Sequence, residues 1–428
     1  MMSLIARLKL AFLMATLAMP GWAVELTISC GAVGREGDYC KQAVQRWAEQ
    51  TGHTVTVAPP PEDDTNERYF RYLLDLGDGD DSIDIYQIDV IWPGLLARHF
   101  IDLREHLADE LIDAHYPTMI ANNTVDGRLV GMPWYTDAGL LFYRQDLLEK
   151  HGLPVPTQWS ELTDIALAIQ MAEREAGQDE LWGYVFQGAP YEGLTCNVLE
   201  WVASYGGGTL VNEAGEITIN NPLAAVAINR AAGWVGTIAP EQVTSFREED
   251  SRIMFQQGNA VFMRNWPYAW SLLNSEDSSV QGLVGVAPLP RGGARGHSAA
   301  TLGGWQLAVS RYSEHPREAA ELVGYLTGAE VQRERAIGGS YAPTIPALYE
   351  DPEVLAASPL FAELSEILEG AVARPTASTR QEYMAVSTRI WEAVNYVLLG
   401  AISARESLTQ LEDQLRLIMV RAERQAAR

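Results

Sequence analysis

The chain has 428 residues, of which 47% are hydrophobic, and its formal net charge is −25. This length is enough for two or more compact units with apolar cores. The strong negative charge argues against nucleic acids and anionic membrane surfaces as partners. The three cysteines form no CxxC pair and the seven histidines show no ligand spacing, so the sequence predicts neither a metal site nor a cofactor.

The first residues have the pattern of an export signal. Arg7 and Lys9 precede an apolar segment from Leu10 to Met19, and Gly21-Trp22-Ala23 follows with small residues at the cleavage positions. This pattern predicts a signal peptide over residues 1–23, cleaved after Ala23. The apolar segment is too short for a stable membrane anchor. We therefore expect a mature protein that is exported to the periplasm.

The following residues alternate between strand and helix patterns. Strands are expected at 25–30, 54–58 and 83–89, with helices at 38–50 and 66–76. Such alternation predicts crossover connections and a parallel sheet. Ligands bind outside the carboxyl ends of strands in sheets of this kind, and Asp89 lies at such an end.

Cys30 and Cys40 stand at the end of the first strand and near the start of the first helix. In an oxidising compartment they are candidates for a disulfide, although their spacing does not decide whether it forms. Cys196 is then the odd cysteine, and we expect it to be a buried thiol.

The segment GMPWYTDAGLLFYRQ at 131–145 combines an aromatic turn, the carboxylate of Asp137 and a strand-like apolar run. A similar combination recurs at 302–312, and NWPYAW at 265–270 is an aromatic cluster. A ring covers the apolar face of a sugar, and a neighbouring carboxylate accepts its hydroxyl hydrogens. Three such segments predict a groove for a polyhydroxylated ligand.

From about residue 146 to 300 the chain is mostly helical, and a helix at 316–336 and a helical region at 378–425 complete it. Strands are expected near 285–290 and 305–310. No long linker separates the two parts of the chain. Two units joined without a linker predict several chain crossings and a hinge between them.

Several segments resemble the extracellular solute-binding proteins of ABC sugar importers (family 1), most closely those of the trehalose/maltose-binding type. The resemblance rests on IDIYQIDVIWPGLLA (83–97), GMPWYTDAGLLFYR (131–144), FQQGNAVFMRNWPYAW (255–270), TLGGWQLAVSRYS (301–313) and ARPTASTRQEY (373–383). It implies an α/β fold of two lobes, the type II periplasmic binding protein fold, with a ligand cleft and three crossing segments. The implied lobes are 24–136 plus 303–341, and a mostly helical 137–302 plus 342–428.

The resemblance also implies which residues bind the ligand. It assigns this role to Glu36, Asp89, Asp137, Trp266, Tyr268, Gly303, Gly304, Trp305 and Arg374. Further candidates are Thr65, Arg68, Trp92 and Tyr135. Each has an ordinary structural alternative: a strand-end Asp often caps a turn, an aromatic residue at helical spacing usually packs in a core, and an arginine can form a surface salt bridge.

The function implied is that of a binding component without enzymatic activity. It would hold an α-glucoside disaccharide such as trehalose, maltose or sucrose, and deliver it as a monomer to a membrane permease powered by a separate ATPase. A monosaccharide, glucosylglycerol or a polyamine is an alternative ligand for the same fold. A secreted glycoside hydrolase also needs carboxylates and aromatic platforms, so it is the alternative from another class.

Overall fold

The computed structural model describes residues 23–426 apart from residues 60–64 and residue 294. The predicted signal peptide, residues 1–23, therefore lies outside the described residues except for Ala23. Within the described part of the chain, no helix is both long and apolar enough to cross a membrane.

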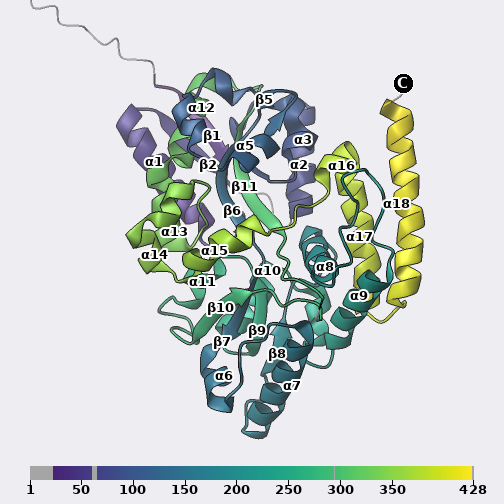
Figure 1. Cartoon of the computed structure of the whole chain (residues 1–428). Coiled ribbons are helices and arrows are strands. Elements are labelled where there is room, and N and C mark those ends of the chain that lie inside the picture. The colour runs from purple at the N-terminus through teal and green to yellow at the C-terminus, as the bar shows by residue number, and fades with distance from the viewer. Residues whose placement is uncertain (1–22, 60–64, 294, 427–428) are drawn as a thin grey trace, which may run out of the picture.

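The first lobe is built on a five-stranded sheet (Figure 1). Its strands, in spatial order, are β2 (Thr54–Ala58), β1 (Glu25–Ser29), β3 (Ile85–Asp89), β11 (Leu302–Val309) and β6 (Met132–Ala138). The helices α1 (Glu36–Thr51) and α2 (Thr65–Gly77) connect the parallel strands β1, β2 and β3, as the alternating pattern predicts. The remainder of the sheet is not parallel, because β11 pairs antiparallel with both β3 and β6.

The second lobe contains a four-stranded sheet and most of the long helices. The sheet has the order β10 (Val284–Pro288), β7 (Leu140–Arg144), β9 (Ala260–Asn265) and β8 (Trp182–Val185). Around it lie α6 (Gln145–His151), α7 (Trp159–Glu175), α8 (Glu192–Ser204), α9 (Pro222–Trp234), α10 (Glu248–Gln256) and α11 (Ala269–Leu273). Its core is strongly aromatic, since Trp159, Trp201 and Trp234 are buried together with Tyr184 and Phe186.

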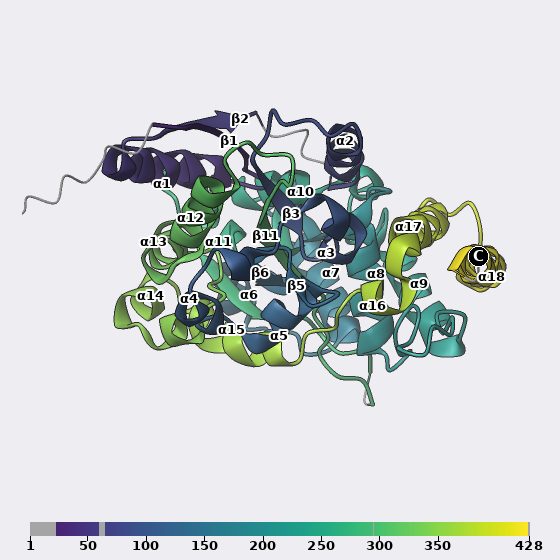
Figure 2. The ribbon, with the colours of Figure 1, turned by 90° about the horizontal axis from the view of Figure 1, so that it is seen from above.

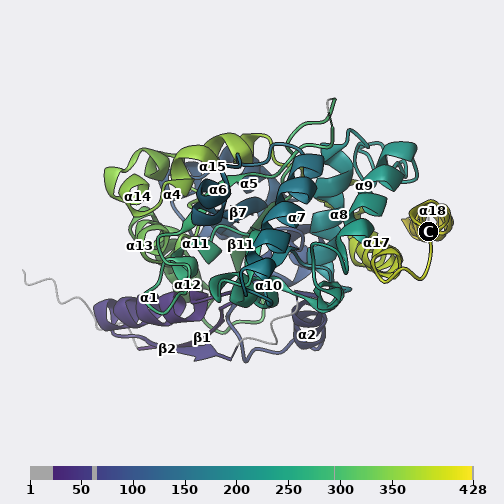
Figure 3. The ribbon, with the colours of Figure 1, turned by 90° about the horizontal axis from the view of Figure 1, so that it is seen from below.

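The remaining elements complete both lobes. The first lobe also carries α3 (Pro93–Leu96), α4 (Asp109–Asp113), α5 (Pro117–Asn122), β4 (Thr124–Val125), β5 (Arg128–Leu129), α12 (Pro316–Thr327) and α13 (Ala329–Gly339). They are followed along the chain by α14 (Pro352–Ala357), α15 (Leu360–Glu369) and α16 (Thr376–Thr379). The last two helices, α17 (Tyr383–Leu398) and α18 (Ala404–Ala426), lie at one side of the molecule beside α8 and α9 (Figures 2 and 3).

The chain passes between the two sheets without a linker. Gly139 alone separates β6 of the first sheet from β7 of the second, and the chain returns to the first sheet where β11 begins at Leu302. Near a further passage, the backbone N–H of Thr136 donates to the carbonyl of Ala342 at 2.9 Å. An apolar cluster that includes Ala138, Leu140 and Leu360 fills the junction.

Cys30 and Cys40 form a disulfide, which attaches α1 to the carboxyl end of β1. The loop between them carries residues that line the cavity described below. Cys196 is buried and free.

Candidate functional site

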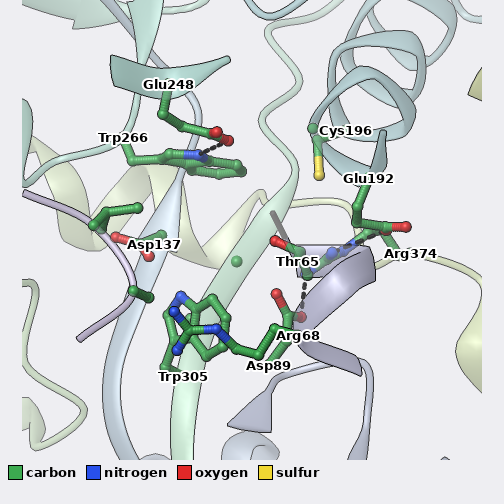
Figure 4. Close-up of a pocket in the computed structure, with 15 residues that line it drawn as sticks. Thr65, Arg68, Asp89, Asp137, Glu192, Cys196, Glu248, Trp266, Trp305 and Arg374 are labelled. Carbon is green, nitrogen blue, oxygen red and sulfur yellow. Dashed lines mark hydrogen bonds and ion pairs between the residues drawn. The ribbon is translucent and has the colours of Figure 1, made fainter. Parts of the chain in front are cut away.

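A cavity lies between the lobes (Figure 4). The first lobe contributes Ala32, Val33, Thr65, Arg68 and Asp89, and the second lobe contributes Glu192, Gly193, Cys196, Glu248, Trp266 and Arg374. Asp137, Gly303, Gly304 and Trp305 complete the wall from β6 and β11, where the chain crosses between lobes. Loop, strand-end and helix-start residues thus meet at one place from segments far apart in the sequence.

Arg374 joins the two lobes at one end of the cavity. Its Nη2 donates to Asp89 Oδ1 at 2.9 Å, and its Nη1 donates to Glu192 Oε1 at 3.0 Å. Asp89 ends β3 in the first lobe, whereas Glu192 begins α8 in the second. Burial raises the pKa of both carboxyl groups, and the arginine charge opposes this rise. The ion pairs thus join the two lobes across the cleft.

Other contacts also cross between the lobes near Arg374. The side-chain oxygen of Asn66 on α2 accepts a hydrogen bond of 3.0 Å from the backbone N–H of Glu192. The amide of Gln381 donates to the carbonyl of Gly94 at 2.8 Å. The α2 helix is thereby fixed against the first turn of α8, which closes this side of the cavity.

Asp137 supplies a free acceptor inside the cavity. It is 6% exposed, and its Oδ1 has no hydrogen-bond partner among the described residues. Burial raises the pKa of Asp137 well above its usual value, and the carboxylates of Glu36 and Asp89 raise it further. A buried acceptor without a partner is costly, so a ligand hydroxyl that donates to it would relieve this cost.

Trp266 forms a flat apolar wall of the cavity. Its Nε1 donates to Glu248 Oε1 at 3.2 Å, and the guanidinium of Arg264 lies 3.8 Å from the ring centre. Gly303 allows the close approach of β11, because a Cβ there would lie 3.2 Å from the indole. Three contacts therefore set the orientation of the ring: the hydrogen bond from its edge to Glu248, the guanidinium of Arg264 against its face, and the neighbouring strand β11.

Trp305 lies on the other side of the cavity in Figure 4, with Asp137 between the two indoles. The Arg68 guanidinium carbon is 5.2 Å from the Trp305 ring centre. The Trp305 and Trp92 rings pack edge to face, with their centres 5.7 Å apart. Gly304, which precedes Trp305, has φ of 131°, and a Cβ there would be 2.7 Å from the Tyr135 carbonyl oxygen. This position requires glycine both for its backbone conformation and for its space.

The structure brings most of the predicted residues together at the cavity. They are Thr65, Arg68, Asp89, Asp137, Trp266, Gly303, Gly304, Trp305 and Arg374. Four predicted residues do not line it: Glu36, Trp92, Tyr135 and Tyr268.

Glu36 lies outside the cavity lining, and its carboxylate is engaged by neighbouring protein groups. Its oxygens accept from the backbone N–H of Ala32 at 2.7 Å, from the Gln87 amide at 3.0 Å and from the Tyr135 hydroxyl at 2.9 Å. Arg335 Nη2 lies 3.2 Å away and completes the shell. Glu36 and Tyr135 together support the loop that carries Ala32 to the cavity.

Trp92 and Tyr268 are also supporting residues. Trp92 is fully buried and packs its ring against Trp305 and Tyr72. The Tyr268 hydroxyl donates to Glu249 at 2.7 Å, and its ring lies against Gly34. Trp92 therefore stands behind the lining residue Trp305, whereas Tyr268 contacts residues that do not line the cavity.

Several lining residues were not predicted. Glu192 and Glu248 each begin a helix, where acidic residues are common because they favour the positive end of the helix dipole. Cys196 follows Glu192 by four residues and therefore shares its helix face. At these positions, no sequence pattern distinguishes a ligand contact from a helix start or a core thiol.

Two lobes that enclose a cavity lined by carboxylates, arginines and indoles define a solute-binding protein of the two-lobed, hinged class. The sequence profile of the family described as bacterial extracellular solute-binding protein matches residues 31–333. The chain belongs to this family.

Individual relatives match along most of the chain. A probable ABC transporter-binding protein of Deinococcus radiodurans is 47% identical and covers 92% of this chain and 93% of its own length. Maltose-bound MalE3 of T. maritima has a TM-score of 0.87 and 37% identity, covering 92% of this chain and 100% of that one. A solute-binding protein of Agrobacterium vitis with bound D-mannitol has a TM-score of 0.80 and 20% identity, covers 94% and 99% of the two chains, and shows the fold alone.

Proposed function

We propose that this protein is the periplasmic substrate-binding component of an ABC importer for sugars. It binds its ligand between the lobes as a monomer and delivers it to a membrane permease driven by a separate ATPase. Membership of the solute-binding family supports this proposal, as do the similar ABC transporter-binding protein and the similar maltose-bound structure.

The single observation that carries the sugar assignment is the pairing of Trp266 with Asp137 inside the closed cavity. The indole offers a flat apolar surface to a sugar ring, and Asp137 Oδ1 offers an acceptor to its hydroxyl groups. The ligand we favour is an α-glucoside disaccharide: trehalose, maltose or sucrose. The 37% identity to the maltose-bound protein supports this narrower choice.

The arrangement of the carboxylates favours binding over hydrolysis. Asp89 and Glu192 are both engaged by Arg374, and the Glu248 oxygens accept from Trp266 and Tyr191. A glycosidase needs one carboxyl group to deliver a proton and a second to act as base or nucleophile. Here Asp89, Glu192 and Glu248 are occupied by protein partners, so Asp137 is left as the one lining carboxyl group with a buried oxygen that has no partner among the described residues.

Titration calorimetry tests the proposal. The protein is titrated with trehalose, maltose, sucrose, glucose, glucosylglycerol and mannitol, with spermidine as a cationic control, and the sugars are then examined for cleavage. We expect one α-glucoside to bind with a Kd of about 1 μM, typical of roughly −8 kcal/mol, without turnover. A neutral sugar should bind almost equally at high salt. Binding of spermidine alone, or cleavage of a sugar, would contradict the proposal.

A further inference from the structure

A buried ion pair lies directly behind the Trp266 wall. Arg264, on β9, is fully buried, and the Glu200 side chain on α8 is 1% exposed. Arg264 Nε donates to Glu200 Oε2 at 2.9 Å, Nη2 donates to Oε1 at 2.5 Å, and Nη1 donates to Gln187 at 3.2 Å. The two parallel hydrogen bonds fix the plane of the guanidinium.

That plane supports the indole of Trp266. The guanidinium carbon of Arg264 lies 3.8 Å from the ring centre, whereas the ring also lines the cavity. An arginine in this position attracts the ring through its quadrupole and packs against its face. Arg264 therefore acts on the cavity through Trp266 and is itself absent from the cavity lining.

Glu200 connects the same pair to two crossings between the lobes. Its Oε1 accepts a hydrogen bond of 3.1 Å from the backbone N–H of Thr301, immediately before β11. A Cβ on Gly139, the residue between β6 and β7, would lie 2.0 Å from Glu200 Oε1 and 2.7 Å from Arg264 Nη2. The ion pair thus packs against both crossings, and Gly139 leaves the space for it.

We propose that Arg264 and Glu200 are positioning residues for ligand binding, which hold the Trp266 wall in a fixed relation to the two interlobe crossings. This inference rests on the proposed function, because it concerns the same sugar site. A buried ion pair contributes little net stability compared with neutral residues of similar size, so stability alone gives no reason for this one. Its role lies in the geometry that it imposes on Trp266, Thr301 and Gly139.

The test compares affinity with stability in the full mature chain. The double variant Arg264→Met/Glu200→Gln removes both charges, keeps the length of the Glu200 side chain and leaves an acceptor for Thr301, and methionine keeps an unbranched apolar side chain that ends short of the guanidinium. With maltose and trehalose as probes, we expect Kd to rise by about tenfold or more while Tm stays within about 4 °C of the wild type. An unchanged Kd in the folded double variant would overturn the inference.

A matched control is the ion pair between Arg144, at the end of β7 in the same sheet, and Asp146, in the first turn of α6; neither residue lines the cavity. We expect Arg144→Met/Asp146→Asn to leave Kd within about twofold, which is less than 0.5 kcal/mol at 25 °C. An equal loss of affinity in this control would mean that the removal of any partly buried ion pair of the lobe weakens sugar binding. That result would contradict the proposed role.

Arg264→Lys keeps the inference testable if the double variant does not fold. Lysine retains a positive charge for Glu200 but cannot both lie flat behind the indole and hold two carboxylate oxygens. We expect a folded protein with a Kd raised by about threefold or more, and an unchanged Kd would overturn the inference. Wild-type protein that binds none of the sugars of the calorimetric test would instead refute the proposed function, so the two failures are distinguishable.

Discussion

At the residue scale, the account depends first on Trp266. Replacing it with alanine should weaken sugar binding by about 2 kcal/mol or more, because the ring supplies a flat apolar wall of the cavity. The measurement is calorimetric Kd, with urea unfolding to show that the fold is kept. Trp182→Ala is the control, since this indole is partly exposed, packs on Arg174 and does not line the cavity. Equal affinities of Trp266→Ala and the wild type would contradict the assigned role.

Asp137 should show a conflict between stability and binding. Because burial raises its pKa, the folded state favours the protonated carboxyl, and this contribution to stability is lost as pH rises from the unfolded pKa of about 3.9. Asp137→Asn should therefore raise Tm at pH 7, with a gain that vanishes below about pH 4, and should weaken sugar binding by about tenfold because an amide NH2, which cannot accept a hydrogen bond, replaces one of the two carboxyl oxygens. Thermal unfolding at several pH values and calorimetry measure the two effects.

Asp351→Asn is the control of opposite sign. Hydrogen bonds from Arg333 lower the pKa of Asp351, so its contribution to stability is present at neutral pH and is lost on acidification. This variant should lower Tm at pH 7 and should not change sugar affinity. A drop in Tm at pH 7 for Asp137→Asn as well would contradict the account of Asp137.

Single residues also show how far the sequence predicts the site. Asp89 and Asp137 stand at strand ends, and the strand pattern places such residues at the edge of a sheet where ligands bind. Glu36 and Tyr268 lie close to cavity residues in the chain, but their side chains point to Arg335 and Glu249 in other segments. The direction of each of these side chains is decided by a partner that is distant in the sequence, and a local sequence pattern carries no information about such a partner.

At the scale of elements, β11 depends on one glycine. Gly304→Ala places a Cβ 2.7 Å from the Tyr135 carbonyl oxygen, and φ of 131° is strained for alanine. We expect a loss of about 2 kcal/mol or more in the free energy of unfolding in urea. Gly208→Ala is the matched control, because its φ is 76° and nothing lies within 4 Å of the added Cβ. A smaller loss for Gly304→Ala than for this control would contradict the role of close packing.

The elements of the first lobe illustrate what alternation along the chain can predict. The strand and helix periods from residue 25 to 89 predicted β1, α1, β2, α2 and β3 and their parallel pairing. They did not predict that β11, more than two hundred residues later, inserts antiparallel between β3 and β6. Pairing between strands so distant in sequence is decided by the packing of both lobes.

At the scale of the whole molecule, Arg374 should control closure. Its ion pairs with Asp89 and Glu192 join the two lobes, and the variant Arg374→Gln removes the charge that both carboxylates require. The wild type should contract on addition of the bound sugar, as small-angle scattering measures it. The variant should contract less at the same sugar concentration and bind more weakly, because two carboxylates are left without a cation. Identical contraction of both proteins would contradict this role.

The predicted lobe boundaries remain a prediction at this scale. The two sheets separate at Gly139, close to the predicted division, whereas the cluster containing Ala138, Leu140 and Leu360 joins the segments around the junction. A pattern of helices and strands does not predict the lobe boundaries here, because the three crossing segments pack around one shared apolar cluster. The prediction of a hinge needs less information than the prediction of boundaries. It rests only on the absence of a long linker, which is visible in the sequence.

The most direct test of the sugar site is a crystal structure of the protein grown with the sugar that binds most tightly. We predict a sugar ring stacked on the cavity face of Trp266, with a hydroxyl group donating to Asp137 Oδ1 and Arg374 still joining the lobes. A sugar bound outside this cavity, or inside it without contact to Trp266 and Asp137, would contradict the account.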